Sequence, residues 1–100
     1  MPKAPSEPYK IFFETLGSKT RWDIVHFLKR RGIMSATAIA KALQLEQSLT
    51  SHNLRRLEVC GFVNVERRGK ERLYSLNRET IKPLLKLMDI HITKFCAKCR

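Results

Sequence analysis

Residues 44–77 constrain the fold of this chain most, because they carry helical periodicity followed directly by that of a β-hairpin. In the helical part, Thr50, Leu54 and Leu57 recur at spacings of four and three residues and therefore share one face. The opposite side is mostly polar or basic and comprises Ser48, Leu49, Ser51, His52, Arg55 and Arg56. An ordinary solvated helix mixes acids with its bases, whereas this side has no carboxylate before Glu58. Small polar groups followed by arginines favour a helix that enters the major groove of DNA.

A basic hairpin is predicted after this helix. Val63 and Val65 alternate, a turn surrounds Gly69, and residues 73–76 form a second short strand. The turn concentrates four cations, namely Arg67, Arg68, Lys70 and Arg72. Because like charges repel and gain nothing from folding, a polyanion explains them best, with a turn kept soluble by its charge as the alternative. The helix and hairpin together predict the recognition helix and wing of a winged helix-turn-helix.

Helical segments on both sides complete the predicted domain. They are residues 9–16, then Arg21–Arg31 capped by Ser18, then a helix capped by Ser35 or Thr37 with Ala38, Ile39, Ala42 and Leu43 inward, and finally Thr80 to about Phe95. The predicted fold is mainly α with a small β-hairpin, in the order α-α-α-α-β-β-α. We expect residues 1–8 to form a disordered arm, 9–95 one DNA-binding and dimerisation domain, and 96–100 a cysteine-containing tail.

The first and last predicted helices carry more apolar surface than a single domain of this size can bury. The residues concerned are Ile11, Phe12, Phe13 and Leu16 in the first helix, and Ile81, Leu84, Leu85, Met88, Ile92 and Phe95 in the last. A monomer would expose these stripes to water. They therefore favour a homodimer that forms through the terminal helices and adds to a small core.

The composition and charge of the chain limit the kinds of partner and the class of protein that we expect. The 20 lysines and arginines outnumber 9 acidic residues, and the net charge of +11 favours nucleic acid, with an anionic membrane surface as the lesser option. No apolar run approaches the roughly 20 residues of a membrane span, and no signal peptide is predicted, so we expect a cytoplasmic protein. The acidic residues are scattered without a nucleophile–base pair, so no enzyme is expected. Three cysteines without a secretory context do not predict a disulfide framework.

Four stretches of the chain form a recognisable set of motifs. They are Leu16-Gly17-Ser18-Lys19-Thr20-Arg21, Ile39-Ala40-Lys41-Ala42-Leu43, Gln47-Ser48 and Ser51-His52 with Leu54 and Leu57, and Gly61-Phe62-Val63. Together they resemble the ArsR/SmtB family of small bacterial and archaeal repressors. The resemblance covers roughly residues 9–95 and is specific in the Gln-Ser and Ser-His pairs. Members of that family are dimeric winged-helix repressors that release operator DNA on a metal or thiol signal. The resemblance implies that Gln47, Ser48, Leu49, Ser51 and His52 face DNA bases, and that Arg67–Arg72 hold the flanking backbone.

Three positions depart from the family pattern. Leu49 stands where relatives usually have a small hydroxyl, so it can touch a thymine methyl but cannot hydrogen-bond. Gln44 replaces the usual glycine of the turn, which must then take a tighter conformation at some cost. Ser35-Ala36-Thr37 stands in place of the thiol pair of relatives with an arsenic or lead site, so that sensor is not expected.

Asp89-Ile90-His91 resembles one half of the interface zinc site of some relatives, whose other half would fall beyond Arg100. Two residues apart on one helix, Asp89 and His91 point about 160° away from each other and cannot share an ion. An antiparallel partner helix would bring Cys96 or Cys99 opposite them, and this donor set suits Zn²⁺ or a similar ion as an effector. A solvated pair on the helix edge is the alternative.

The sequence Cys96-Ala97-Lys98-Cys99 is compatible with a redox sensor as well. Its basic neighbours favour thiolates, and the two thiols can pair within the chain or across a dimer. The absence of any ligand sensing is a third alternative, and no cofactor is required.

The sequence therefore predicts a homodimeric transcription regulator, expected to repress, that binds double-stranded DNA at a pseudo-palindromic operator. Two alternatives stay open. One is a winged helix used as a protein-interaction module, and the other is a non-specific architectural DNA binder.

Overall fold

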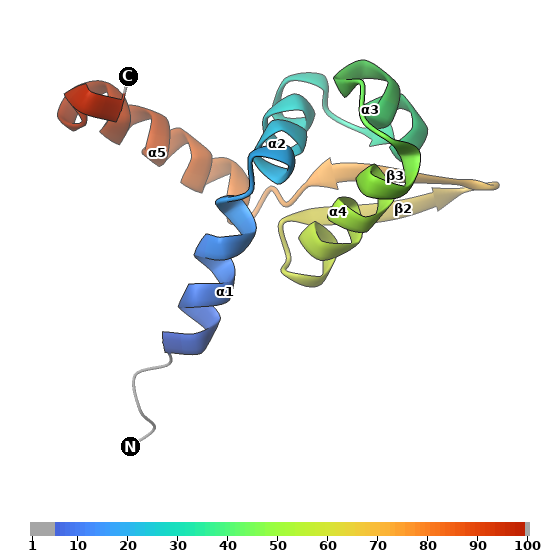
Figure 1. Cartoon of the computed structure of the whole chain (residues 1–100), viewed down its shortest axis with the longest axis horizontal. Helices are drawn as coiled ribbons and strands as arrows, with labels where there is room; N and C mark the ends of the chain where they lie inside the picture. Colours follow the sequence, from blue (N-terminus) through green and yellow to red (C-terminus); the bar gives the residue numbers. More distant parts are fainter. Residues whose placement is uncertain (1–5, 100) are drawn as a thin grey trace.

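The computed structural model describes residues 6–99, and the side chains of residues 6–98 (Figure 1). The elements in chain order are α1 (Ser6–Leu16), α2 (Lys19–Arg31), β1 (Met34–Ser35), α3 (Ala36–Leu43), α4 (Gln47–Val59), β2 (Val63–Arg68), β3 (Glu71–Leu76), α5 (Ile81–Phe95) and the 3₁₀ turn η1 (Ala97–Cys99). Helices α2, α3 and α4 pack against a small antiparallel sheet. This is a winged helix-turn-helix, so the predicted fold class is confirmed.

Side-chain caps explain where two helices begin. The Ser18 hydroxyl accepts a hydrogen bond from the Arg21 N–H at 3.3 Å and starts α2, as predicted. Of the two caps considered for α3, Ser35 is the one used, since its hydroxyl accepts from the Ala38 N–H at 3.1 Å. Gln44, which ends α3 and begins the turn to α4, has a left-handed backbone with φ of 56°. Among the described residues, it is the one non-glycine position with positive φ, a conformation that is uncommon for a residue with a Cβ.

The core lies where α2, α4 and the sheet meet. Its buried members are Ile24, Val25, Phe27, Leu28, Ile39, Leu54, Leu57, Phe62, Val63, Tyr74, Leu76, Ile81 and Leu85. The prediction that Ala42 faces this core was wrong, because Ala42 is exposed and Ala40 is buried instead. At 100° per residue, Ala42 lies about 110° from the centre of the face formed by Ile39, Ala40 and Leu43.

The sheet contains a strand that the sequence pattern did not predict. The hairpin of β2 and β3, called the wing below (residues 63–76), turns through Gly69 and Lys70, and Gly69 has φ of 61°. A glycine with positive φ at the first turn position suits a two-residue hairpin. The short strand β1 adds to the other edge of β3, through the pairs Met34↔Tyr74 and Ser35↔Leu73, and gives the order β1-β3-β2. Two residues are too few to show strand periodicity.

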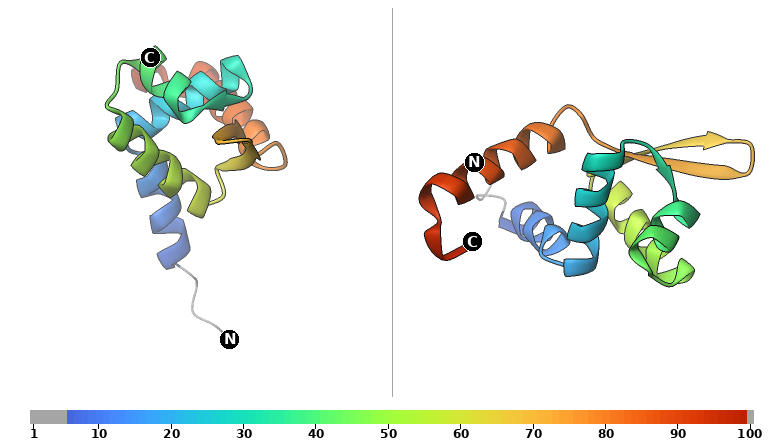
Figure 2. Two further views of the ribbon diagram at one scale, coloured as in Figure 1. Left: turned by 90° about the vertical axis from the view of Figure 1, so that its right-hand side faces the viewer. Right: turned by 90° about the horizontal axis from the view of Figure 1, so that it is seen from above.

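Helices α1 and α5 extend away from the rest of the domain (Figures 1 and 2). Only the first two turns of α5 reach the core, where Ile81 and Leu85 are buried. Farther along, Leu87 is 64% exposed and Phe95 is 74% exposed in the single chain, where the stripe was expected to be open to water unless a partner subunit covers it. On α1, Phe13 is 67% exposed. The apolar surface of both terminal helices is therefore not covered within the chain.

Helix α1 begins earlier than expected. It starts at Ser6 and not at residue 9, so the last part of the predicted disordered arm is helical, while residues 1–5 lie outside the described part of the chain. Pro8 is tolerated because it falls in the first turn, where its missing N–H has no helical acceptor. Pro83 occupies the same kind of place in α5. Within the described residues, no helix has both the length and the apolar character needed to cross a membrane.

We expect Gln44→Gly to stabilise the protein. The left-handed conformation costs a residue with a Cβ roughly 1–2 kcal/mol, a cost that glycine avoids. Glycine also gains entropy in the unfolded chain, so the net rise in the free energy of unfolding should be about 0.5–1 kcal/mol. Urea denaturation should show a higher midpoint with an unchanged m value. As a control, Lys41→Gly inside α3 should lower stability by about 1 kcal/mol. A lower midpoint for Gln44→Gly would contradict the assignment of strain.

Candidate nucleic-acid interface

The position of α4 is set by its buried face. Thr50, Leu54 and Leu57 are each 0% exposed, as their spacing predicts, and Thr50 also donates its hydroxyl to the Glu46 carbonyl at 2.9 Å. This packing turns the predicted base-facing and backbone-facing residues of α4 outward. Gln47, Ser48, Leu49, Ser51, His52, Arg55 and Arg56 are all exposed. The structure therefore presents this set on one solvent-facing side of α4.

The N-terminus of α4 is open to a ligand. Glu46 is the N-cap residue, but its side chain makes no capping hydrogen bond to the helix. Its carboxylate instead accepts the Ser48 hydroxyl at 2.9 Å. The first N–H groups of a helix have no partner within the helix and carry partial positive charge. Ser48 must exchange Glu46 for another acceptor before its hydroxyl can donate to a base.

The wing carries its cations on two faces. Successive strand residues alternate, so Arg67 shares the face of Val63, whose side chain enters the core. Arg72 lies directly opposite Arg67 in the register. Like charges in opposed positions of an antiparallel pair destabilise it. Arg68 lies on the other face of β2, where its Nε donates to a Glu66 carboxylate oxygen at 2.7 Å.

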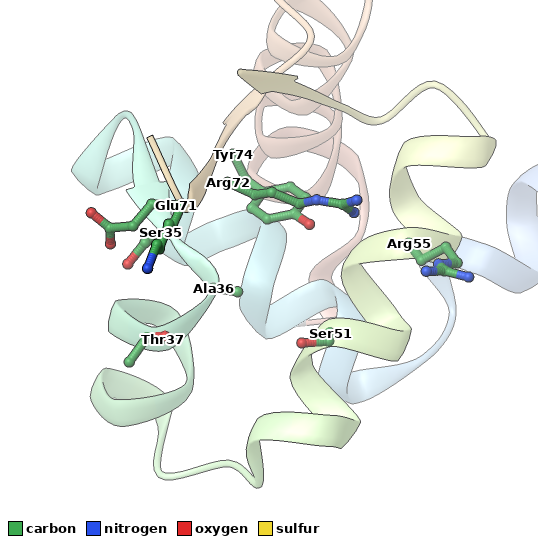
Figure 3. Close-up of a pocket in the computed structure, with 9 residues that line it drawn as sticks. Ser35, Ala36, Thr37, Ser51, Arg55, Glu71, Arg72 and Tyr74 are labelled. Carbon is green, nitrogen blue, oxygen red and sulfur yellow. The ribbon is translucent and has the colours of Figure 1, made fainter. Parts of the chain in front are cut away.

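A groove of about 340 Å³ joins the wing to the helix-turn-helix (Figure 3). It is lined by Ser35, Ala36, Thr37, Ser51, Arg55, Lys70, Glu71, Arg72 and Tyr74, and is called the basic groove below. In Figure 3 the Arg72 side chain extends from β3 toward α4, past the ring of Tyr74. The lining has three cations and four hydroxyl-bearing residues next to a helix N-terminus, a set that suits an anionic backbone, and Glu71 is the one acid among them.

Some residues of this interface were not identified from the sequence. Ser35 was recognised as a cap and Thr37 as its alternative, but neither was placed beside the wing. Asn53, on α4, is 5% exposed and was not assigned to any face. Its amide oxygen accepts from Arg21 of α2 at 3.0 Å. Two polar residues 32 positions apart give no periodic signal, so only the fold reveals this pair.

Among the side chains that the structure describes, the residues considered for a metal site are not grouped into one. The Asp89 carboxylate accepts from Lys29 at 2.9 Å, and the His91 ring lies 5.5 Å from that of Phe95. Cys96 is disulfide-bonded, and the side chain of Cys99 lies outside the described residues. In the part of the chain that the structure describes, no three His, Cys, Asp or Glu residues are grouped to hold an ion. A site completed by a partner helix stays a prediction.

Comparison with known proteins gives the family. Residues 18–65 match the model described as "Bacterial regulatory protein, arsR family". The uncharacterized HTH-type transcriptional regulator MJ1325 of Methanocaldococcus jannaschii is 30% identical over 77 residues, which cover 77% of this chain and 86% of that protein. The cadmium resistance transcriptional regulatory protein CadC homolog of Staphylococcus aureus is 29% identical over 87 residues, covering 87% and 71% respectively.

A solved structure shares the whole architecture. It is the homodimeric winged helix-turn-helix DNA-binding domain of Mb0332 from Mycobacterium bovis, described as a possible ArsR-family transcriptional regulator. It matches with a TM-score of 0.82 at 21% identity, over 95% of this chain and 90% of that one. The motifs, the fold and these matches agree, and the protein belongs to the ArsR family of bacterial transcriptional regulators.

Proposed function

We propose that this regulator binds DNA sequence-specifically as a homodimer, at a pseudo-palindromic operator, and represses transcription. The observation that carries the proposal is the exposed polar face of α4, which continues through the basic groove into the cationic wing. A helix projecting short polar groups at one end and arginines farther along matches the geometry of a major-groove reader. A net charge of +11 supplies the attraction to phosphate that specific and non-specific binding share.

In this proposal the side chains divide into two groups. Gln47, Ser48, Leu49, Ser51 and His52 lie at the N-terminal end of α4 and contact base edges, with Leu49 suited to a thymine methyl. Arg55, Arg56, Arg67, Arg68, Lys70 and Arg72 contact the backbone. The ion pair between Arg68 and Glu66 is exposed and therefore weak, so a phosphate can replace the carboxylate. Half-sites should lie about one helical turn apart, ~10 bp or a little more.

The terminal helices support the homodimer. Tyr9 and Phe13 of α1 and Leu87 and Phe95 of α5 are each more than 60% exposed. Large aromatic and aliphatic groups on each of the two projecting helices add apolar surface of a kind that soluble monomers rarely leave open. The Mycobacterium bovis domain with the same fold is homodimeric. A dimer of this kind on a promoter excludes polymerase by overlap alone, which is why we favour repression.

Two substitutions separate base contacts from backbone contacts. Arg68→Ala should weaken binding to every duplex about equally and reduce the slope of log affinity against log salt by about one. His52→Ala should instead change the preferred sequence, costing roughly 1–3 kcal/mol at one base pair. Selection from a random duplex pool, followed by anisotropy titrations at several salt concentrations, measures both effects. Lys86→Ala, on the exposed side of α5, serves as the matched charge control.

The same titrations test the other functions. If neither variant changes affinity or sequence preference, the proposed docking is wrong. If the protein binds no DNA even at low salt, the winged helix acts as a protein-interaction module. Equal binding to the selected duplex and to unrelated DNA identifies a non-specific architectural binder.

We infer that the C-terminal segment controls release of DNA through the thiols of Cys96 and Cys99. The disulfide bond of Cys96 supports a redox role, because a cysteine in a disulfide cannot ligate a metal ion. Oxidation removes two electrons and two protons from two thiols, and hydrogen peroxide takes them up to become two water molecules. Zinc binding by Asp89, His91 and these thiolates is the competing proposal, and it requires the reduced protein.

Peroxide and zinc, each added to the reduced dimer, distinguish the redox proposal from the metal proposal. We expect peroxide to lower the affinity of the reduced dimer for its selected duplex, and Cys96→Ser to abolish that response. Zinc added to the reduced dimer should have no effect. The reverse pattern, in which zinc releases DNA and His91→Ala abolishes the release, would replace the redox proposal with a metal-responsive one. Cys60→Ser, which alters a thiol outside this segment, is the control for the peroxide response: whatever its affinity for DNA, that affinity should still fall when peroxide is added.

A further inference from the structure

The Arg21 side chain connects the end of α1 to the middle of α4. Its Nε donates to the Thr15 carbonyl at 2.8 Å, and its Nη2 donates to the Glu14 carbonyl at 3.4 Å. Its Nη1 donates to the Asn53 amide oxygen at 3.0 Å. Arg21 itself belongs to the first turn of α2. One guanidinium group therefore holds residues from three helices in a fixed relation.

The chemistry of these contacts suits arginine specifically. The last carbonyls of a helix have no partner within the helix, and α1 has no basic residue of its own in its last turn. A cation there satisfies the carbonyls and complements the partial negative charge of the helix end. The planar guanidinium group offers donors in several fixed directions, so it can serve α1 and Asn53 together. A lysine ammonium group cannot reproduce that geometry.

Asn53 receives this contact in a rigid setting. It is 5% exposed, and its amide nitrogen donates to the Leu49 carbonyl at 2.9 Å, one turn earlier in α4. The amide is thus held by its own helix on one side and by Arg21 on the other. Leu49 and His52, the neighbours of Asn53 in space and in sequence, belong to the exposed face of α4. Any movement of Asn53 therefore moves that face.

A second attachment prevents α4 from pivoting about Asn53. The Thr15 hydroxyl and the Cys60 sulfur, at the C-terminal end of α4, are 3.5 Å apart. Thr15 is 0% exposed, so its contacts with Cys60 and Arg21 are shielded from solvent on the Thr15 side. Seven residues separate Asn53 from Cys60, which corresponds to about 10 Å along a helix. Two contacts that far apart determine both the position and the direction of α4 relative to α1.

We propose that Arg21 is a positioning residue that sets the separation of the two recognition helices in the dimer. The inference rests on the proposed DNA-binding homodimer. Because α1 carries exposed apolar surface for the partner subunit, its orientation relative to α4 decides where each α4 meets DNA. Each added base pair moves a half-site by about 3.4 Å and rotates it by roughly 35°. An Arg21-fixed dimer should therefore tolerate only one half-site spacing.

The experiment compares duplexes that differ only in spacing. The probe is the duplex selected from a random pool by the wild-type full chain, together with versions carrying one base pair more or less between the half-sites. The variant is Arg21→Lys, which keeps the positive charge. Its matched control is Arg30→Lys, the same exchange at an exposed position of α2. Anisotropy titrations give affinity, spacing preference and salt slope, and sedimentation gives the oligomeric state.

We expect Arg21→Lys to bind the selected duplex about tenfold more weakly and to lose most of the wild-type preference for one spacing. The salt slope should not change, because no phosphate contact is removed. Arg30→Lys should match the wild type throughout. Three results would overturn the inference: a wild-type spacing preference in Arg21→Lys, a salt slope reduced by about one, or a monomeric variant.

Asn53 provides an independent pair of variants should Arg21→Lys fail to fold. Asn53→Ala removes the acceptor and should lose the spacing preference, whereas Asn53→Asp keeps an acceptor for Arg21 and should retain it. Equal spacing behaviour of the two variants would overturn the inference. Failure of the wild type to select any duplex would reject the proposed function as well, whereas failure of these variants alone would reject only the role of Arg21.

Discussion

The burial of one face of α4 is the constraint on which the other features depend. Leu54 and Leu57 are fully buried against α2 and the sheet, and each contributes about 1.5–3 kcal/mol through the hydrophobic effect. A helix rotated by one residue would turn by about 100° and place polar groups in the core. The packing therefore fixes which side chains meet solvent. His52 and its exposed neighbours owe their position to leucines that never touch a ligand.

The charges of the wing favour binding of an anionic partner over stability of the isolated domain. The opposed Arg67 and Arg72 repel each other across the wing, and Lys70 lies at its tip. A few carboxylates offset this repulsion in the isolated chain, as Glu66 does for Arg68 at 2.7 Å. Such exposed pairs contribute little and are weakened by salt. DNA phosphates that replace these carboxylates would also release counterions from the DNA. The repulsion within the wing lowers the stability of the free protein, and DNA binding would relieve it.

The terminal helices link dimerisation to DNA binding in the proposed mechanism. Each packs on the domain mainly near one end. Helix α5 does so through Ile81 and Leu85, with the exposed ion pair between Lys29 and Asp89 farther along, and α1 through Thr15 and the aromatic contact between Phe12 and Phe62, whose centroids are 5.0 Å apart. Their free lengths expose apolar surface. An element attached at one end transmits its orientation through that attachment, which places Arg21 between the surface for a partner subunit and the surface for DNA.

Local periodicity was enough to predict the helices, the inward Thr50, Leu54 and Leu57, and the hairpin around Gly69, because these features depend on neighbours a few residues away. The strand β1 could not be predicted, since Met34 and Ser35 become a strand only by pairing with β3. The basic groove likewise depends on contacts between residues distant in sequence. The sequence by itself determined the elements and the chemistry of the exposed α4 face. Tertiary structure decided that the wing and α3 converge on that face and that Arg21 reaches Asn53, because such contacts join residues that no local pattern relates.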